Sequence, residues 1–375
     1  MTDTTLSPPR AGAPIAGRLA LVALALAAAL AVAALAGARY GALLLIGLGF
    51  GITLEGLRFG FAGPWRAMIL RREPAGLVAQ LLAIALVAAV AFPLLQSNAG
   101  ELMGAHAPVG VAMIGGAFVF GAAMQLVLGC GSGTLVNAGS GNPVGALALP
   151  FFALGSFAAT LHLDWWLGLG TAPVVALAGN SGLGLTLAAL AAVAVLALAL
   201  GKPGSRKLPG RLWLAAVLLA GLALLNLIVS GQPWGVVYGL GLWAAKGVQA
   251  LGADLTGVAF WAAPGNAERL AQSVLTDVTS LTNIGILAGA ALVAAWRGGL
   301  TARLPRLSAR AWVAVVLAGL VLGYSSRLAF GCNVGAFFSG ISTGSLHGWV
   351  WFVAAFAGSY VGIKARPALG LEARP

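Results

Sequence analysis

The chain has 375 residues, of which 60% are hydrophobic and 8% are charged, and its mean hydropathy is +0.97. Water-soluble domains carry about 25% charged residues, so this composition excludes a soluble domain and predicts a protein embedded in a lipid bilayer. The formal net charge of +12 would suggest a nucleic-acid partner in a soluble protein. Here most Lys and Arg lie in short connections between apolar runs, so we expect no nucleic acid to bind.

Ten apolar runs are each close to the ~20 residues that a helix needs to cross a bilayer. They lie near residues 19–38, 40–57, 76–95, 110–128, 143–163, 181–200, 212–230, 271–295, 311–330 and 346–363. The first run follows the more polar start Met1–Arg18, and its length and the lack of a small-residue cleavage site predict a retained helix rather than a signal peptide. The sequence therefore predicts an all-α polytopic membrane protein with about ten spanning helices.

Two stretches do not fit simple spans. Residues 56–70 hold arginines and a proline in an apolar context, and residues 231–265 hold several polar side chains between ends that should face the same side. Irregular backbone at membrane depth is tolerated only where protein or a water-filled cavity covers it. We therefore expect both stretches to be short helices that enter the membrane and return. The segments 133–140 and 335–342 are also too short to span.

The basic residues predict the orientation of the chain. They fall into four groups, which the positive-inside rule places in the cytosol together with both termini. The groups are Arg66, Arg71 and Arg72; Lys202, Arg206, Lys207 and Arg211; Arg297, Arg303, Arg306 and Arg310; and Lys364, Arg366 and Arg374. Segments 96–109 and 164–180 contain no Lys or Arg, so we expect them outside.

The only two cysteines of the chain lie in similar short segments, 202 residues apart. At that offset six identities appear: Gly121 with Gly323, Leu126 with Leu328, Gly129 with Gly331, Cys130 with Cys332, Gly133 with Gly335, and Ser140 with Ser342. The predicted topology approaches the first cysteine from the cytosolic end of its span and the second from the outer end. This is the pattern of an inverted repeat whose halves meet near the membrane midplane.

The repeat divides the chain into five parts. Residues 1–39 form a tail with an extra helix, 40–200 the first transport half, 201–211 a cytosolic linker, 212–366 the second transport half, and 367–375 a cytosolic tail. The predicted overall shape is an hourglass of two pseudo-symmetric halves.

The Gly-Cys segments have the chemistry of an anion pathway. A short helix that starts at membrane depth points free backbone N–H groups and partial positive charge at its N-terminal side, which favours an anion. A thiol adds a polarisable sulfur and a weak donor, which fits a sulfur-bearing anion better than phosphate. The candidate substrate-binding residues around the two thiols are Gly129, Cys130, Gly131, Ser132, Gly133, Gly331, Cys332, Asn333 and Gly335.

The sequence also allows two other roles for the cysteines. A free Cys can be a small buried hydrophobe, and the two could form a disulfide if their Cα atoms came within about 7 Å. Their spacing gives neither a CxxC pair nor a zinc-type cluster, so we expect no metal or cofactor.

Further polar residues in apolar runs are also candidates. Arg327 precedes Cys332 by five residues, and a charge there either draws anions inward or snorkels to the interface. We expect an intrahelical pair between Glu55 and Arg58. Asp277 and Asn283 are expected to join helix–helix hydrogen bonds within a span, and Lys246 to lie in the outer vestibule.

These motifs resemble the YeeE/YedE-type sulfur transport family, the bacterial inner-membrane permeases for thiosulfate and their relatives. The resemblance covers about 40 to 366 and is most specific in Leu128–Thr134, Gln232–Tyr238, Leu242–Lys246, Phe330–Ala336 and Ser342–Trp349. It implies an hourglass of spanning helices with pairs of half-spanning helices. It also implies that thiosulfate passes along a row of thiols by transient S–H hydrogen bonds, with Cys130 and Cys332 at two positions. A cytosolic sulfur-carrier protein is an implied partner.

One position departs from the family pattern. The thiosulfate permeases carry a further Cys in the first re-entrant segment, whereas this chain has Gly60 within Leu57–Gly63. One relay thiol is therefore absent, and the substrate could be another sulfur or selenium species.

Two other classes of function compete with the permease. A membrane sulfurtransferase or disulfide carrier would use both thiols covalently, and a passive channel would leak anions without selection. The chain contains no Walker-type phosphate loop, so we expect no ATP hydrolysis and no enzyme activity.

Overall fold

The computed structural model describes residues 15–299 and 307–372. Arg10, Arg303, Arg306 and Arg374, which belong to the predicted tails and to the third basic group, lie outside these residues. Within them the chain is helical, and β-structure is limited to two isolated bridges, Gly110 with Thr171 and Ala176 with Ser345. The predicted helical membrane protein is confirmed.

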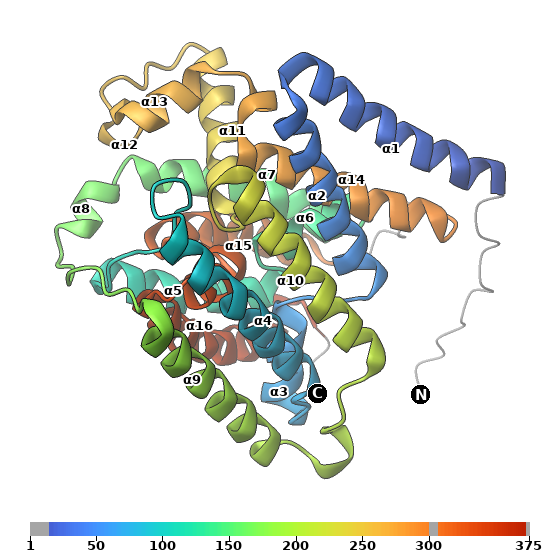
Figure 1. The fold of residues 1–375 in the computed structure, drawn as a ribbon, viewed down its shortest axis with the longest axis vertical. Coiled ribbons are helices and arrows are strands. Elements are labelled where there is room, and N and C mark those ends of the chain that lie inside the picture. The colour runs from blue at the N-terminus through green and yellow to red at the C-terminus, as the bar shows by residue number, and fades with distance from the viewer. Residues whose placement is uncertain (1–14, 300–306, 373–375) are drawn as a thin grey trace.

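Ten helical segments of the described residues are long and apolar enough to cross a membrane. Their helices are α1 (Ile15–Ala36), α2 (Ala38–Gly56), α4 (Ala75–Ser97), α5 (Val111–Val127), α7 (Pro143–Thr160), α9 (Gly179–Leu200), α10 (Gly210–Ser230), α14 (Val278–Trp296), α15 (Ala309–Leu328) and α16 (Leu346–Ala365). Figure 1 shows α1 projecting from the rest of the bundle, and few of its residues are buried.

Four shorter helices follow long ones and are too short to cross a bilayer on their own. They are α3 (Ala62–Arg71), α6 (Gly131–Gly139), α11 (Val237–Ala250) and the π-helix η3 (Asn333–Gly340). Small helices complete the connections: α8 (Leu163–Leu167), α12 (Ala259–Ala262), α13 (Pro264–Ala271), η1 (Pro203–Ser205), η2 (Val274–Thr276) and η4 (Pro367–Leu369).

The helix contacts come in matching pairs if α2, α4, α5 and α7 of the first half correspond to α10, α14, α15 and α16 of the second. The contact of α2 with α14 then matches that of α10 with α4, and the contact of α5 with α16 matches that of α15 with α7. Two corresponding pairs also contact each other directly, α5 with α15 and α2 with α10. This pattern supports a duplicated architecture, while the opposite orientation of the halves and the re-entrant path of the short helices stay predictions.

Glycine allows the closest of these helix contacts. A Cβ at Gly121 of α5 would overlap the carbonyl oxygen of Ala355 in α16, and one at Gly358 of α16 would overlap that of Phe118 in α5. Membrane helices have no hydrophobic drive toward one another in lipid, so backbone proximity and dispersion contacts must hold them. This packing accounts for part of the high glycine content.

Two expectations about polar residues are wrong. Glu55 pairs with Arg297, at 3.7 Å, rather than with Arg58. Asp277 caps α14 by accepting the Ser280 amide at 2.7 Å, because the predicted 271–295 span begins only at Val278. Lys246 donates to the carbonyls of Leu270 and Gln272 and so ties α11 to the end of α13; its place in an outer vestibule stays a prediction.

Candidate functional site: two thiols between two pockets

Each cysteine follows the same backbone turn. Leu128 and Phe330 have φ values of 56°, in the left-handed region that is rare for residues other than glycine. In each of the two segments the next amide donates to the carbonyl five residues earlier: Gly129 to Met124 at 3.2 Å and Gly331 to Ser326 at 2.9 Å. The turn ends the long helix and starts the short one, so each cysteine becomes the N-cap of a short helix.

A third copy of the turn precedes α3. Arg58 has a φ value of 50°, and the Phe59 amide reaches back five residues to Leu54 at 2.9 Å. Gly60 therefore follows its left-handed residue by two positions, as the cysteines follow theirs. A Cβ built on Gly60 meets nothing within 4 Å, so the position has room for a thiol.

Backbone amides of both short helices are directed at the thiols. The amide of Gly133 points to Cys130, whose Sγ also lies 3.3 Å from the Ser132 hydroxyl. The amides of Val334 and Gly335, and that of Gly131 from the other copy, point to Cys332. The helix N-terminus predicted from the sequence is therefore present at each thiol, with the free N–H groups that favour negative charge.

The two thiols are buried neighbours. Cys130 and Cys332 are 1% and 0% exposed, their side chains interact, and both are free. The structure thus brings the two predicted segments together and shows no disulfide between them.

A pocket of about 380 Å³ lies on the Cys130 side of the thiols. We call it the Cys130-side pocket; its lining includes Arg58, Gly60, Ala62, Pro64, Leu128, Gly129, Cys130, Ser132, Gly133 and Asn137. A second pocket, of about 390 Å³, lies on the Cys332 side. This Cys332-side pocket is lined by residues that include Gln232, Trp234, Tyr238, Phe260, Arg269, Thr279, Arg327, Gly331 and Gly335.

The two pockets share no lining residue, and the segments around the thiols separate them. Gly131 lies close to the second thiol, because a Cβ there would lie 3.0 Å from Cys332 Sγ and 3.2 Å from Val236 Cγ1.

Two guanidinium groups face the Cys332-side pocket. Arg327 donates to the Ser156 hydroxyl at 3.2 Å and lies 5.0 Å from the centre of the Phe260 ring, while its buried Nε has no hydrogen-bond partner. Arg269 of α13 lies 4.9 Å from the Tyr238 ring, which Arg327 also approaches at 5.7 Å. Among the described residues neither arginine has a carboxylate within ion-pair distance, so the pocket suits an anion.

One predicted residue lines neither pocket, and one pocket residue was not predicted. Asn333 is fully buried beside Cys332, and neither of its side-chain polar atoms has a partner. It lines neither pocket. Arg269 was not predicted, because it lies in a polar connection with no motif, and only the fold of α12 and α13 over the pocket brings it there. No group of three or more His, Cys, Asp or Glu side chains gathers anywhere in 15–299 or 307–372.

The sequence profile of the family described as sulphur transport matches residues 57–361, and the chain belongs to this family. It is 29% identical to a thiosulfate transporter, TsuA, of Spirochaeta thermophila over 338 residues, 82% of this chain and 93% of that protein. It is 36% identical over 95 residues (25% of this chain) to the probable transporter YedE of Escherichia coli, and 30% identical over 136 residues (36% of this chain) to that of Salmonella typhimurium. These matches span 23% and 33% of the two YedE proteins.

Proposed function

We propose that this member of the sulphur transport family is a permease that imports thiosulfate, or a closely related sulfur-containing anion, across the bacterial inner membrane. The observation that carries the proposal is the pair of neighbouring thiols at two short-helix N-termini, next to two pockets that share no lining residue. The relative named as a thiosulfate transporter, which matches this chain over most of both lengths, supports the choice of substrate.

The arrangement suggests a sequence of binding events. Arg269 and Arg327 attract the dianion into the Cys332-side pocket, where charge-assisted hydrogen bonds hold its oxygens. The anion then passes Cys332 and Cys130, whose S–H groups and neighbouring amides replace part of its hydration. No bond to sulfur forms or breaks in this proposal, and the protein is not an enzyme. The anion leaves through the Cys130-side pocket beside Gly60.

Contacts among the basic groups support the proposed orientation. The Lys202 amide donates to the Arg72 carbonyl at 2.9 Å, and Arg297 donates to the Gly56 carbonyl at 2.7 Å. Arg66 and Arg366 share the carboxylate of Glu372. These contacts connect described members of the first, second and fourth groups, and they hold Arg297 of the third group at the end of α2. The positive-inside rule assigns these basic residues to the cytosolic side. A cytosolic sulfur carrier would receive the substrate there.

Uptake of radiolabelled thiosulfate into proteoliposomes tests the proposal, with Cys130→Ala, Cys332→Ala and the two Cys→Ser variants. We expect transport by the wild type, loss in both alanine variants, and partial retention in the serine variants, because a hydroxyl still donates a hydrogen bond. Transport that survives both alanine substitutions would make the cysteines packing residues and would exclude the thiol pathway.

The neighbouring thiols also favour one alternative, a membrane sulfurtransferase or disulfide carrier that uses both thiols covalently. The serine variants separate the two functions, since covalent chemistry requires sulfur at both positions. Complete loss in both serine variants, with a persulfide or disulfide that turns over in the wild type, would favour the alternative.

A further inference from the structure

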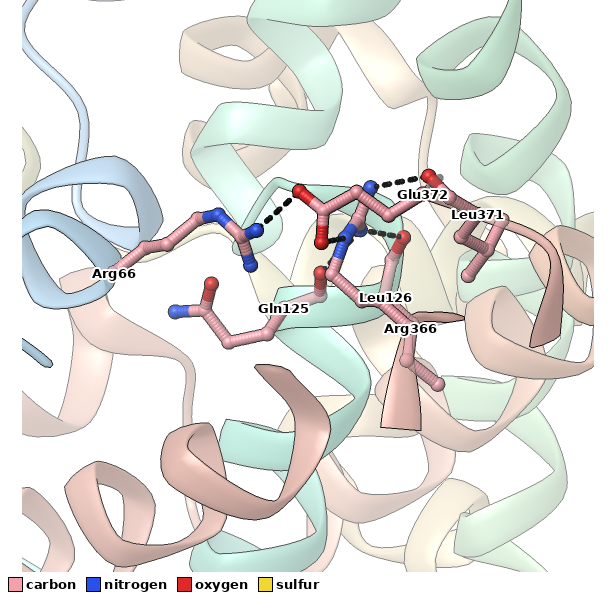
Figure 2. Close-up of polar contacts among 6 residues, drawn as sticks. All are labelled: Arg66, Gln125, Leu126, Arg366, Leu371 and Glu372. Atoms are coloured by element: carbon pink, nitrogen blue, oxygen red, sulfur yellow. Dashed lines mark hydrogen bonds and ion pairs between the residues drawn. The ribbon is translucent and has the colours of Figure 1, made fainter. Parts of the chain in front are cut away.

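A carboxylate from the C-terminal segment lies between two largely buried arginines that contact the helices on either side of the Cys130-side pocket. Glu372 forms an ion pair with Arg66 of α3 and another, at 3.4 Å, with Arg366, which directly follows α16 (Figure 2). The Arg66 and Arg366 side chains are 15% and 7% exposed, whereas that of Glu372 is 41% exposed. The acid is thus the accessible member of the group.

Arg366 also holds the end of α5. Its Nη1 donates to the carbonyls of Gln125 and Leu126 at 2.6 and 2.8 Å, and its Nη2 donates to that of Leu371 at 3.0 Å. The last carbonyls of a helix lack partners within it, so Arg366 caps α5 just before the turn to Cys130. Figure 2 shows these contacts converging on one guanidinium.

These contacts link the two walls of the Cys130-side pocket. One wall contains Ala62 and Pro64 of α3, and the other contains Leu128 to Cys130, which follow α5. Gln125 joins the walls directly by donating to the Ala62 carbonyl at 3.1 Å. Glu372 joins them a second time, because it pairs both with Arg66 of α3 and with the arginine that caps α5.

We propose that the C-terminal segment 366–372 is an autoinhibitory strap, which holds α3 against the end of α5 and keeps the Cys130-side pocket closed around Cys130. Release of Glu372 lets α3 move away, and the pocket then opens toward the thiol. The role of this movement in substrate release rests on the proposed function, but the movement itself is measurable without any substrate.

The rate at which Cys130 reacts with N-ethylmaleimide tests the strap. Because the chain has two cysteines, full-length Cys332→Ser protein in detergent carries Cys130 as its only thiol. In this background Cys130 of the Glu372→Gln variant should react at least about threefold faster, since loss of the Glu372 ion pairs raises the population of the open state. Modification is followed by intact mass.

A matched control is Glu73→Gln. Glu73 pairs with Arg71 at 2.8 Å near the end of α3, with both side chains well exposed, and this hydrogen bond lowers the pKa of Glu73, so it is ionised. Its neutralisation makes the same charge change without touching the strap and should leave the rate unchanged. Equal reaction rates for Glu372→Gln and its parent, or an equal acceleration by Glu73→Gln, would overturn the proposal.

Hydrogen exchange of residues 62–71 gives a second readout with both native cysteines present. We expect faster exchange of this segment in Glu372→Gln than in the wild type, and unchanged exchange in α14. Unaltered exchange in 62–71 would overturn the strap even if the Cys332→Ser background folded poorly.

Discussion

Substitution of Gly131 by alanine places a methyl group against the second thiol, between the segments that line the two pockets. The new Cβ would lie 3.0 Å from Cys332 Sγ, 3.2 Å from Val236 Cγ1 and 3.5 Å from Cys332 Cβ. Atoms in favourable contact are about 3.5–4.0 Å apart, so the sulfur and the valine methyl must each move by roughly half an ångström. Such overpacking costs about 1–3 kcal/mol.

If this cost falls on the passage of the anion, thiosulfate uptake slows by about 5- to 150-fold, at tenfold for each 1.4 kcal/mol. The assay is the initial rate of labelled thiosulfate uptake into proteoliposomes. Gly115→Ala is the control, since Gly115 lies in α5 and its added Cβ meets nothing within 4 Å. Gly131→Ala protein that is folded and transports within about twofold of the wild type would refute the conduit between the pockets.

Three further substitutions test other parts of the structure. Gly60→Cys should fold as the wild type and lower the KM for thiosulfate, because the added side chain enters free space in the Cys130-side pocket; an unchanged KM would remove position 60 from the pathway. Arg327→Gln should raise the KM about tenfold or more through loss of a charge-assisted hydrogen bond, and concentration-dependent uptake measures it; an unchanged KM would assign Arg327 to packing alone. Gly358→Ala should cost about 1–3 kcal/mol of stability, since its methyl would overlap the Phe118 carbonyl, and should therefore lower the melting temperature in detergent. An unchanged melting temperature would contradict the close α5–α16 packing.

Hydropathy and motif spacing predicted the spanning segments and the thiol segments, because both depend only on the order of residues along the chain. A helix must have about 20 apolar residues to cross a bilayer, so the ten spanning segments follow from composition along the sequence. The duplicated Gly-Cys segments also predicted a helix N-terminus close to each thiol, and the same local sequence forms the same left-handed turn at Leu128 and Phe330.

The partners of charged side chains could not be predicted in this way. Glu55 has Arg58 three residues away, where a helical pair is favourable, yet its carboxylate lies near Arg297, because α2 packs on α14. Arg269 likewise lies in a connection that gives no periodic signal.

The sequence by itself determined that this chain is a helical membrane protein of the sulphur transport family with two similar thiol segments. Those features depend on local composition and on the backbone preferences of short motifs. Only the tertiary structure decided that Cys130 and Cys332 are neighbours, that two arginines face one pocket without a carboxylate, and that Glu372 ties α3 to the end of α5. Each of these contacts joins residues far apart in the chain, and helix packing alone sets which of them meet.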